Sequence, residues 1–207
     1  MTDIGGPYAD LEALKHRLDI PDDNTDHDTD LESSLIAASG TVNHFCGRQF
    51  GKTESATERR FRAGRRGVDV DDFWTADGLI VTPWANGAAG TSWTADYEFE
   101  LEPPDGVVDG VPGWPFNRLT YSTFGTWTFY GVAHVRVTAK WGWADVPGPV
   151  RSATLMLAAM DWKSADAPFG YAAFGDYAAR IRGNPMAQAL LAPYQTYDAR
   201  LQAAVGS

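Results

Sequence analysis

The spacing of hydrophobic positions changes twice along this chain, from helical to strand-like and back to helical. Near the start, apolar residues recur every three or four positions, which places them on one face of a helix. This spacing predicts a short helix over residues 9–18 and a longer one over about 30–46, which Gly47 ends. The apolar stripe of the longer helix consists of Leu31, Leu35, Ala38, Val42 and Phe45.

The segment between these two helices, residues 22–30, is rich in aspartate and is predicted to be a solvated loop. Thr29 and Glu32 have the Ser/Thr-x-x-Glu spacing of a capping box, in which two side chains satisfy free amide groups at a helix start. Aspartates just before a helix also interact favourably with the positive end of its dipole. We therefore expect the longer helix to begin at about residue 30.

Between residues 57 and 143, apolar and polar positions alternate, as they do in strands with one buried face. Tyr97, Phe99 and Leu101 alternate with glutamates, and residues 134–141 follow the same pattern. Further strands are predicted at 60–63, 68–70, 79–82, 119–122 and 126–130, with a loop rich in proline and glycine between residues 102 and 114. Short strands separated by turn signals predict a small antiparallel sheet, sandwich or barrel.

The stretch 140–163 joins this region to a very apolar helix. Pro147 and Pro149 cannot donate to a β-ladder, so the strand must end before them, and Pro149 suits the first position of a helix. Residues 155–160 are apolar without interruption and therefore cover the whole circumference of that helix. The helix must be central or covered by another subunit. We expect Leu157→Asp to prevent folding or assembly, because it would bury an unpaired charge.

The C-terminal part is predicted to add one further helix. Asn184 and Pro185 are residue types preferred at a helix cap and first position, and this helix runs to about Leu191 before Pro193 ends it. Residues 177–182 form either a helical turn or a strand, and residues 201–207 are expected to fray. The whole pattern predicts an α+β fold. Its discontinuous helical-bundle core combines the N-terminal helices (1–55) with a C-terminal part (147–207), and an antiparallel β insertion (56–146) separates them.

Composition narrows the class of function. The chain has 207 residues and a formal net charge of −10, which argues against a protein that grips nucleic acid by its phosphates. The single cysteine, Cys46, cannot form an internal disulfide, which fits a reducing cytoplasm. The sequence shows neither a signal peptide nor the run of about 18 apolar residues that a membrane span needs. We therefore expect assembly in the cytoplasm and no membrane partner.

No motif in the sequence indicates catalysis, a cofactor or a metal site. The four histidines lie far apart, and no Gly-x-Ser-x-Gly motif is present. Residues 46–53 resemble a phosphate-binding loop, but only three residues separate the two glycines where that motif has four. We expect a protein that is not an enzyme and has no cofactor. A small hydrolase is the alternative that would require a clustered histidine and carboxylate.

Two features of the β region indicate binding to a partner. A basic cluster either holds a strand and hairpin tip in solution or contacts an acidic partner or DNA phosphate. The eight tryptophans suit core packing or a subunit interface. The alternative is a carbohydrate- or partner-binding module carried by the tryptophan-rich β region. The basic cluster consists of Arg59, Arg60, Arg62, Arg65 and Arg66.

Three segments of the chain resemble the head-to-tail adaptor (connector) proteins of long-tailed phages. The first comprises YADLEALKHRLDI, the aspartate-rich loop and DLESSLIAASGTVNHFCGRQF, and it is similar to the opening helices of that family. The second, VRVTAKWGWADVPGPVRSATLMLAAMDW, resembles the family's strand, glycine-aromatic corner and long helix. The third, IRGNPMAQALLAPYQ, is similar to the C-terminal segment of many actinophage adaptors. Together they cover roughly half of the chain, and the β region between 57 and 126 is longer than the usual hairpin of the family.

This resemblance implies a structural virion protein of the head–tail neck. Such proteins form a ring, commonly of twelve copies, that docks under the portal protein after genome packaging. The ring extends the channel, lets double-stranded DNA pass without sequence-specific binding, and offers a platform to the stopper or tail-completion protein. The β insertion is then expected at the rim of the ring or facing the next neck protein.

The resemblance and the hydrophobic pattern together select two sets of residues. Core and subunit-interface positions are expected at Leu31, Leu35, Val42, Phe45, Trp141, Trp143, Val150, Leu155, Leu157, Met160 and Trp162. Portal-docking positions are expected at Ile181, Pro185, Leu190, Leu191 and Tyr194.

Overall fold

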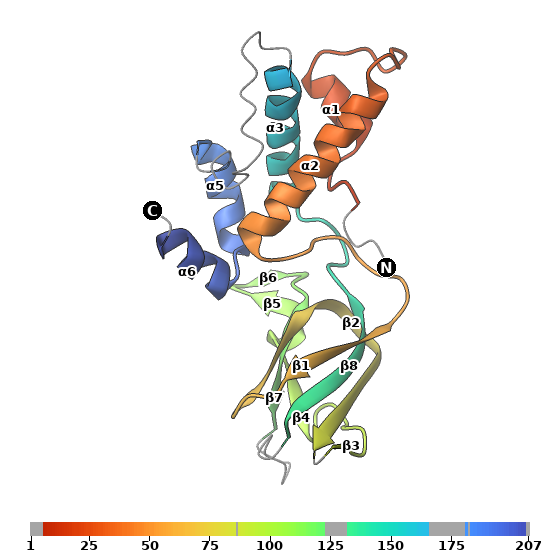
Figure 1. Cartoon of the computed structure of the whole chain (residues 1–207), viewed down its shortest axis with the longest axis vertical. Helices are drawn as coiled ribbons and strands as arrows, with labels where there is room; N and C mark the ends of the chain where they lie inside the picture. Colours follow the sequence, from red (N-terminus) through yellow and green to blue (C-terminus); the bar gives the residue numbers. More distant parts are fainter. Residues whose placement is uncertain (1–5, 86, 123–131, 166–180, 182, 206–207) are drawn as a thin grey trace. The chain divides into compact units, whose positions relative to one another are not determined.

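The chain forms two compact units in a computed structural model that describes residues 6–85, 87–122, 132–165, 181 and 183–205 (Figure 1). The helical unit comprises Asp3–Phe50 and Val146–Ser207, and the β unit comprises Gly51–Asp145. Helices and an antiparallel sheet are both present, so the α+β class that the hydrophobic pattern predicts is confirmed. Within the described residues, none of the helices combines the length and apolar character needed to span a bilayer.

The helical unit is built around α2 and α3, which lie side by side (Figure 1). Helix α3 also contacts α1 and α5, so segments far apart in the sequence share one core. Apolar side chains of both long helices are fully or almost fully buried, among them Leu35, Val42, Val150 and Leu157. The elements are α1 (Leu11–Arg17), α2 (Asp28–Cys46), α3 (Gly148–Ala165), α5 (Pro185–Leu191), the 3₁₀ turn η2 (Ala192–Tyr194) and α6 (Tyr197–Val205).

Helix α2 begins earlier than the sequence predicts, and the expected capping box is absent. His27 occupies the cap position and makes no side-chain cap hydrogen bond, while Thr29 lies inside the first turn. The cause is Lys15, a buried lysine whose ammonium group pairs with Asp28 and donates to two carbonyl oxygens of the aspartate-rich segment. That segment therefore folds around a buried cation. At the other end, Gly47 has a φ of 65° and ends the helix, as predicted.

The C-terminal segment matches the sequence prediction at the start of α5 but not in α6. The Asn184 side chain accepts a hydrogen bond from the Ala187 amide at 3.1 Å, which confirms it as the cap of α5. The predicted fraying of residues 201–207 is wrong for 201–205, because α6 continues to Val205, and residues 206–207 fall outside the described residues. The α6 start is held on the end of α2, where the Thr196 amide donates to the Cys46 carbonyl at 2.8 Å. The prediction for 177–182, except Ile181, falls outside the described residues.

The β unit has one main sheet with the strand order β1-β8-β2-β7-β4, entirely antiparallel, and β3 pairs with β2. The predicted strands 68–70 and 79–82 belong to one long strand, β2. Its first part pairs with β7 and its last part with β8, and Phe73 faces both partners. The strands are β1 (Thr57–Arg62), β2 (Gly67–Ala85), β3 (Ala88–Ala89), β4 (Phe99–Glu102), β5 (Val107–Val108), β6 (Val111–Pro112), β7 (Phe116–Tyr121) and β8 (His134–Trp141).

Two strand predictions need comment. The segment between residues 102 and 114 is not only a loop, because it holds the 3₁₀ turn η1 (Pro104–Gly106) and the small hairpin β5–β6. The predicted strand 126–130 lies outside the described residues. The inner side of the sheet is apolar, and Val68, Phe73, Leu119, Val137 and Trp141 are fully buried there.

Candidate interaction surfaces

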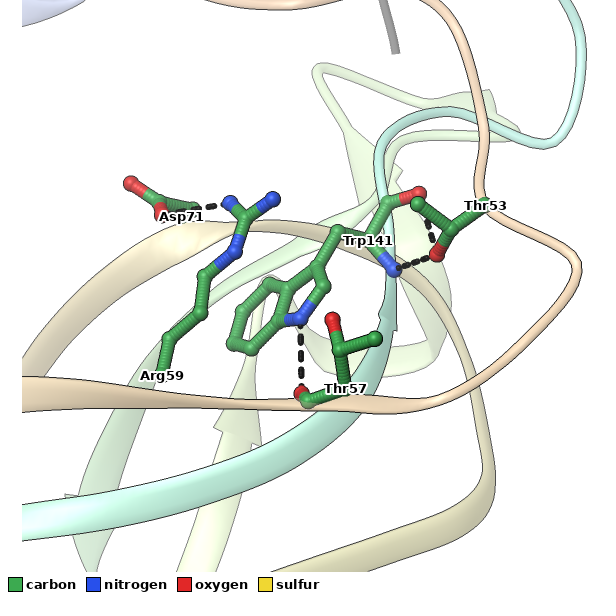
Figure 2. Close-up of polar contacts among 5 residues, drawn as sticks. All are labelled: Thr53, Thr57, Arg59, Asp71 and Trp141. Carbon is green, nitrogen blue, oxygen red and sulfur yellow. Dashed lines mark hydrogen bonds and ion pairs between the residues drawn. The ribbon is translucent and has the colours of Figure 1, made fainter. Parts of the chain in front are cut away.

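The corner at Trp141 is closely packed and presents no open site. The Trp141 ring is fully buried, and its Nε1 donates to the Thr57 carbonyl at 2.9 Å. The Trp141 amide donates to Thr53 Oγ1 at 2.8 Å (Figure 2). The Arg59 guanidinium lies over the indole at 4.5 Å and pairs with Asp71 at 2.6 Å (Figure 2). Arg59 therefore makes its contacts within the β unit, unlike the other arginines of the basic cluster.

Gly142 allows two backbone segments to meet at this corner. Its φ is 97°, and a Cβ atom placed there would lie 1.7 Å from the Gly51 carbonyl oxygen. The Gly142 amide donates to the Asp72 carbonyl at 2.6 Å, and Trp143 Nε1 donates to the Asp72 carboxylate at 2.9 Å. Trp143 is buried as well. The corner therefore positions the sheet and has no accessible reactive group.

The remaining four arginines of the cluster are exposed. Arg60 and Arg62 project from the outer side of β1, because Phe61 between them faces inward. Arg65 and Arg66 lie in the turn that leads to β2. Strand order then brings further residues beside Arg60 and Arg62 that are distant in the sequence.

Three rows of side chains cross β1, β8 and β2 on the outer side of the sheet. Arg62 is in register with His134, and His134 with Trp84. The next row is Arg60, Arg136 and Thr82, and the third is Glu58, Thr138 and Ile80. We name these nine residues the basic face: Glu58, Arg60, Arg62, Ile80, Thr82, Trp84, His134, Arg136 and Thr138.

The basic face has more positive charge than its own carboxylate can balance. Arg60 and Arg136 are directly opposite each other, and like charges in that arrangement are unfavourable. Arg136 lies over the Trp84 ring at 4.1 Å and has Glu58 as its ion-pair partner at 3.5 Å. The His134 ring stacks on Trp84 with a centroid distance of 5.7 Å. Burial lowers the pKa of His134, and the charges of Arg60 and Arg136 lower it further.

The other half of the same sheet has the opposite charge. Across β4, β7 and β2, one row is Glu102, Arg118 and Asp69, and the next is Glu100, Thr120 and Gly67. Arg118 pairs with Asp69 at 2.6 Å and lies 3.6 Å from Glu102. Thr120 Oγ1 donates to the Glu102 carboxylate at 2.6 Å. We name these six residues the acidic face.

The predicted core and interface residues of the helical unit differ in burial. Leu31, Leu35, Val42, Val150 and Leu157 are buried, whereas Phe45, Leu155 and Trp162 are half-buried. Met160 is 46% exposed, although it lies in the apolar run that was predicted to be covered on all sides. One chain by itself therefore does not cover the whole circumference of α3.

The predicted portal-docking residues also differ in burial. Ile181 and Leu191 are fully buried within the chain, while Leu190 and Tyr194 are half-buried and Pro185 is exposed. The Tyr194 ring packs edge-on against Phe50 at 5.9 Å, and burial raises its pKa. The sequence prediction missed three exposed apolar side chains of this region: Met186 on α5, and Tyr197 and Leu201 on α6, a helix that was not expected.

The alternatives of a carbohydrate site and of a catalytic site find little support in the described residues. None of the described tryptophans is exposed, so they do not form an open stacking platform. No group of three or more histidine, cysteine or acidic side chains there is placed to hold a metal ion. Burial raises the pKa of Cys46 to about 12, and nearby Arg48 opposes this only in part. The Cys46 thiol is therefore a poor nucleophile.

Comparison with solved structures finds this fold in chains of gene transfer agent particles. No protein-family model and no curated protein matches the sequence. The solved structures that share the fold include a chain in the virion of a native gene transfer agent particle, with a TM-score of 0.53. They also include a chain in the neck of an empty particle computed with C6 symmetry, with a TM-score of 0.51. Each is 18% identical, and the match covers 95% of this chain and 93% of the other. The likeness therefore extends over almost the whole of both chains.

Proposed function

We propose that this chain is a structural neck protein, a head-to-tail adaptor that forms a ring beneath the portal protein of a phage-like particle. The observation that carries the proposal is the shared fold with a chain of the gene transfer agent neck, over 95% of the residues. The adaptor-like segments support it independently, because their resemblance lies in the sequence and does not depend on the fold. The ring extends the DNA channel and provides the platform for the stopper or tail-completion protein.

Exposed apolar side chains of the helical unit support a role in assembly. Met160 on α3 and Ile36 on α2 are exposed, although both belong to the helices that form the core. We assign the Met160 side of α3 to a neighbouring subunit, which would complete the burial that its sequence demands. On the C-terminal segment we assign portal contacts to the accessible residues Pro185, Leu190 and Tyr194, while Ile181 and Leu191 hold that segment from inside.

The charge of the chain suits a DNA channel. A net charge of −10 disfavours tight binding to phosphate, so double-stranded DNA can pass through a ring of such subunits without being held. This role needs no catalytic residue and no cofactor. It requires only surfaces that fit the neighbouring subunits, the portal protein above and the stopper protein below.

Cryo-electron microscopy of particle necks tests the proposal directly. Particles that carry a tagged copy of this chain should show it as a closed ring in contact with the portal protein. Mass measurement of the isolated neck should give a whole number of copies per ring, with twelve expected from the adaptor resemblance. A chain located in the capsid shell or the distal tail, and absent from the neck, would contradict the proposal.

A further inference from the structure

We propose that in this ring the basic face of one subunit binds the acidic face of the next. The inference rests on the proposed ring and adds the residues that join the β units of neighbouring copies. Both faces belong to one β unit, so each subunit offers one of each. The partner that binds the basic face is therefore a second copy of this chain.

Charge complementarity carries the first step. The basic face has three guanidinium groups and one carboxylate, Glu58, whereas the acidic face has three carboxylates and one guanidinium, Arg118. The isolated chain leaves Arg60 directly opposite Arg136. Carboxylates from a second copy would relieve this repulsion, because opposite charges across an interface are mutually stabilising.

The composition of the basic face favours a protein partner over DNA. Ile80 is 51% exposed at one corner of the face, and Trp84 supports Arg136 and His134 at the other. Arginine and tryptophan are the residues most enriched among those that dominate protein–protein binding energy. A phosphate backbone would gain nothing from the exposed isoleucine.

The separation of the charges determines how two copies can associate. A symmetric contact centred on either face would bring like charges together, so it is disfavoured. A head-to-tail contact pairs the basic face with the acidic face and leaves one unused face at each end. Such contacts close into a ring when the rotation between subunits allows it.

The strength of this contact should depend on salt. Exposed ion pairs are weak individually and are screened over about 8 Å at physiological ionic strength. Free subunits should therefore associate weakly, whereas subunits already held side by side in a ring bind at a high effective concentration. Association of the free protein should therefore be measured at low ionic strength.

Sedimentation equilibrium of the full chain tests the interface. We expect wild-type protein to form oligomers at about 20 mM ionic strength and to dissociate at about 0.5 M salt. Arg60→Glu/Arg62→Glu should weaken association by at least about tenfold, because both charges lie on the basic face. Arg65→Glu/Arg66→Glu is the matched control: it makes the same change of charge in the adjacent turn and should have a much smaller effect. Far-UV circular dichroism establishes that each variant is folded.

A mixing experiment tests the head-to-tail arrangement. Asp69→Lys/Glu100→Lys reverses two charges of the acidic face and leaves the basic face intact, so this variant should also fail to associate with itself. Mixed with Arg60→Glu/Arg62→Glu, it should associate again, although neither variant associates with itself. The two intact faces match in that mixture, and the two reversed faces also match each other, because each has exchanged its charge.

Three results with the free protein would overturn the inference. They are a wild-type chain that stays monomeric up to about 1 mM at low salt, a control variant as defective as Arg60→Glu/Arg62→Glu, and a mixture that forms no complex. DNA binding that depends on Arg60 and Arg62 without self-association would assign the face to phosphate instead. Intact neck rings made of Arg60→Glu/Arg62→Glu subunits would refute this interface and leave the proposed function standing. If the mixture forms the complex but the chain is absent from necks, the proposed function fails alone.

Discussion

At the scale of single residues, a few positions hold distant segments of the chain together. Gly142 combines a positive φ with a close approach of the Gly51 carbonyl. Lys15 is buried and is satisfied only because the aspartate-rich segment folds around it. Thr53, in turn, bonds the Trp141 backbone on both its amide and its carbonyl sides. Each of these residues connects chain segments that are distant in the sequence.

Gly142→Ala should destabilise the β unit by roughly 2–5 kcal/mol, because it adds both backbone strain and a steric clash. Gly78→Ala is the matched control, since Gly78 has a φ of 77° but nothing within 4 Å of the added Cβ. The control should show only the strain, about 1 kcal/mol. Urea denaturation followed by tryptophan fluorescence measures both values. Equal effects of the two substitutions would show that the contact with Gly51 is unimportant.

His134 should titrate below the usual histidine value of about 6.5. Burial and the charges of Arg60 and Arg136 lower its pKa in the folded state, so the unfolded chain takes up the proton at higher pH. The contribution to stability is present above the unfolded pKa and is lost as pH falls through the folded one. NMR titration of the imidazole should show the pKa rising in Arg60→Gln. An unchanged pKa in this variant would mean that Arg60 does not act on His134.

At the scale of elements, local sequence signals set the end of a helix only where no contact with a distant part of the chain replaces them. Asn184 caps α5 through its own side chain, as the sequence predicts. At the start of α2, the ion pair of Asp28 with Lys15 replaces the expected capping box. Strand β2 shows the same limit, because two predicted strands are one bent strand shared between two partners.

Asn184→Ala should lower the free energy of unfolding by about 1 kcal/mol, because the Ala187 amide loses its acceptor. Asn184→Asp retains an acceptor at the same place and should lose much less. Thermal unfolding monitored by far-UV circular dichroism compares the two variants. Equal melting temperatures for Asn184→Ala and wild type would show that the cap contributes nothing.

At the scale of the whole molecule, the two units have separate cores, and this should be visible in unfolding. Leu157 is buried in the helical unit, whereas Met160, three residues further along α3, is exposed. Seven of the eight tryptophans belong to Gly51–Asp145, so their fluorescence reports on the β unit while far-UV circular dichroism is dominated by the helices.

Leu157→Asp should destabilise the helical unit by on the order of 4 kcal/mol, because it buries an unpaired charge. Met160→Asp places the same charge at an exposed position and should change stability by less than about 1 kcal/mol in the free chain. In urea titrations, Leu157→Asp should lose its helical signal early and keep the tryptophan transition near its wild-type midpoint. Simultaneous loss of both signals would show that the units unfold as one.

The sequence alone determined the types of element and most of their positions, because periodicity, prolines and glycines act locally. It also identified most of the buried stripe of α2, the α5 cap and the adaptor resemblance. Only the tertiary structure decided which arginines of the cluster are available to a partner. Arg59 is held by Trp141 and Asp71, whereas Arg60 is exposed and lies opposite Arg136 on the neighbouring strand. Strand order and register follow from long-range pairing, which leaves no mark at any single position. For that reason the two charged faces could be recognised only once the strands were in place.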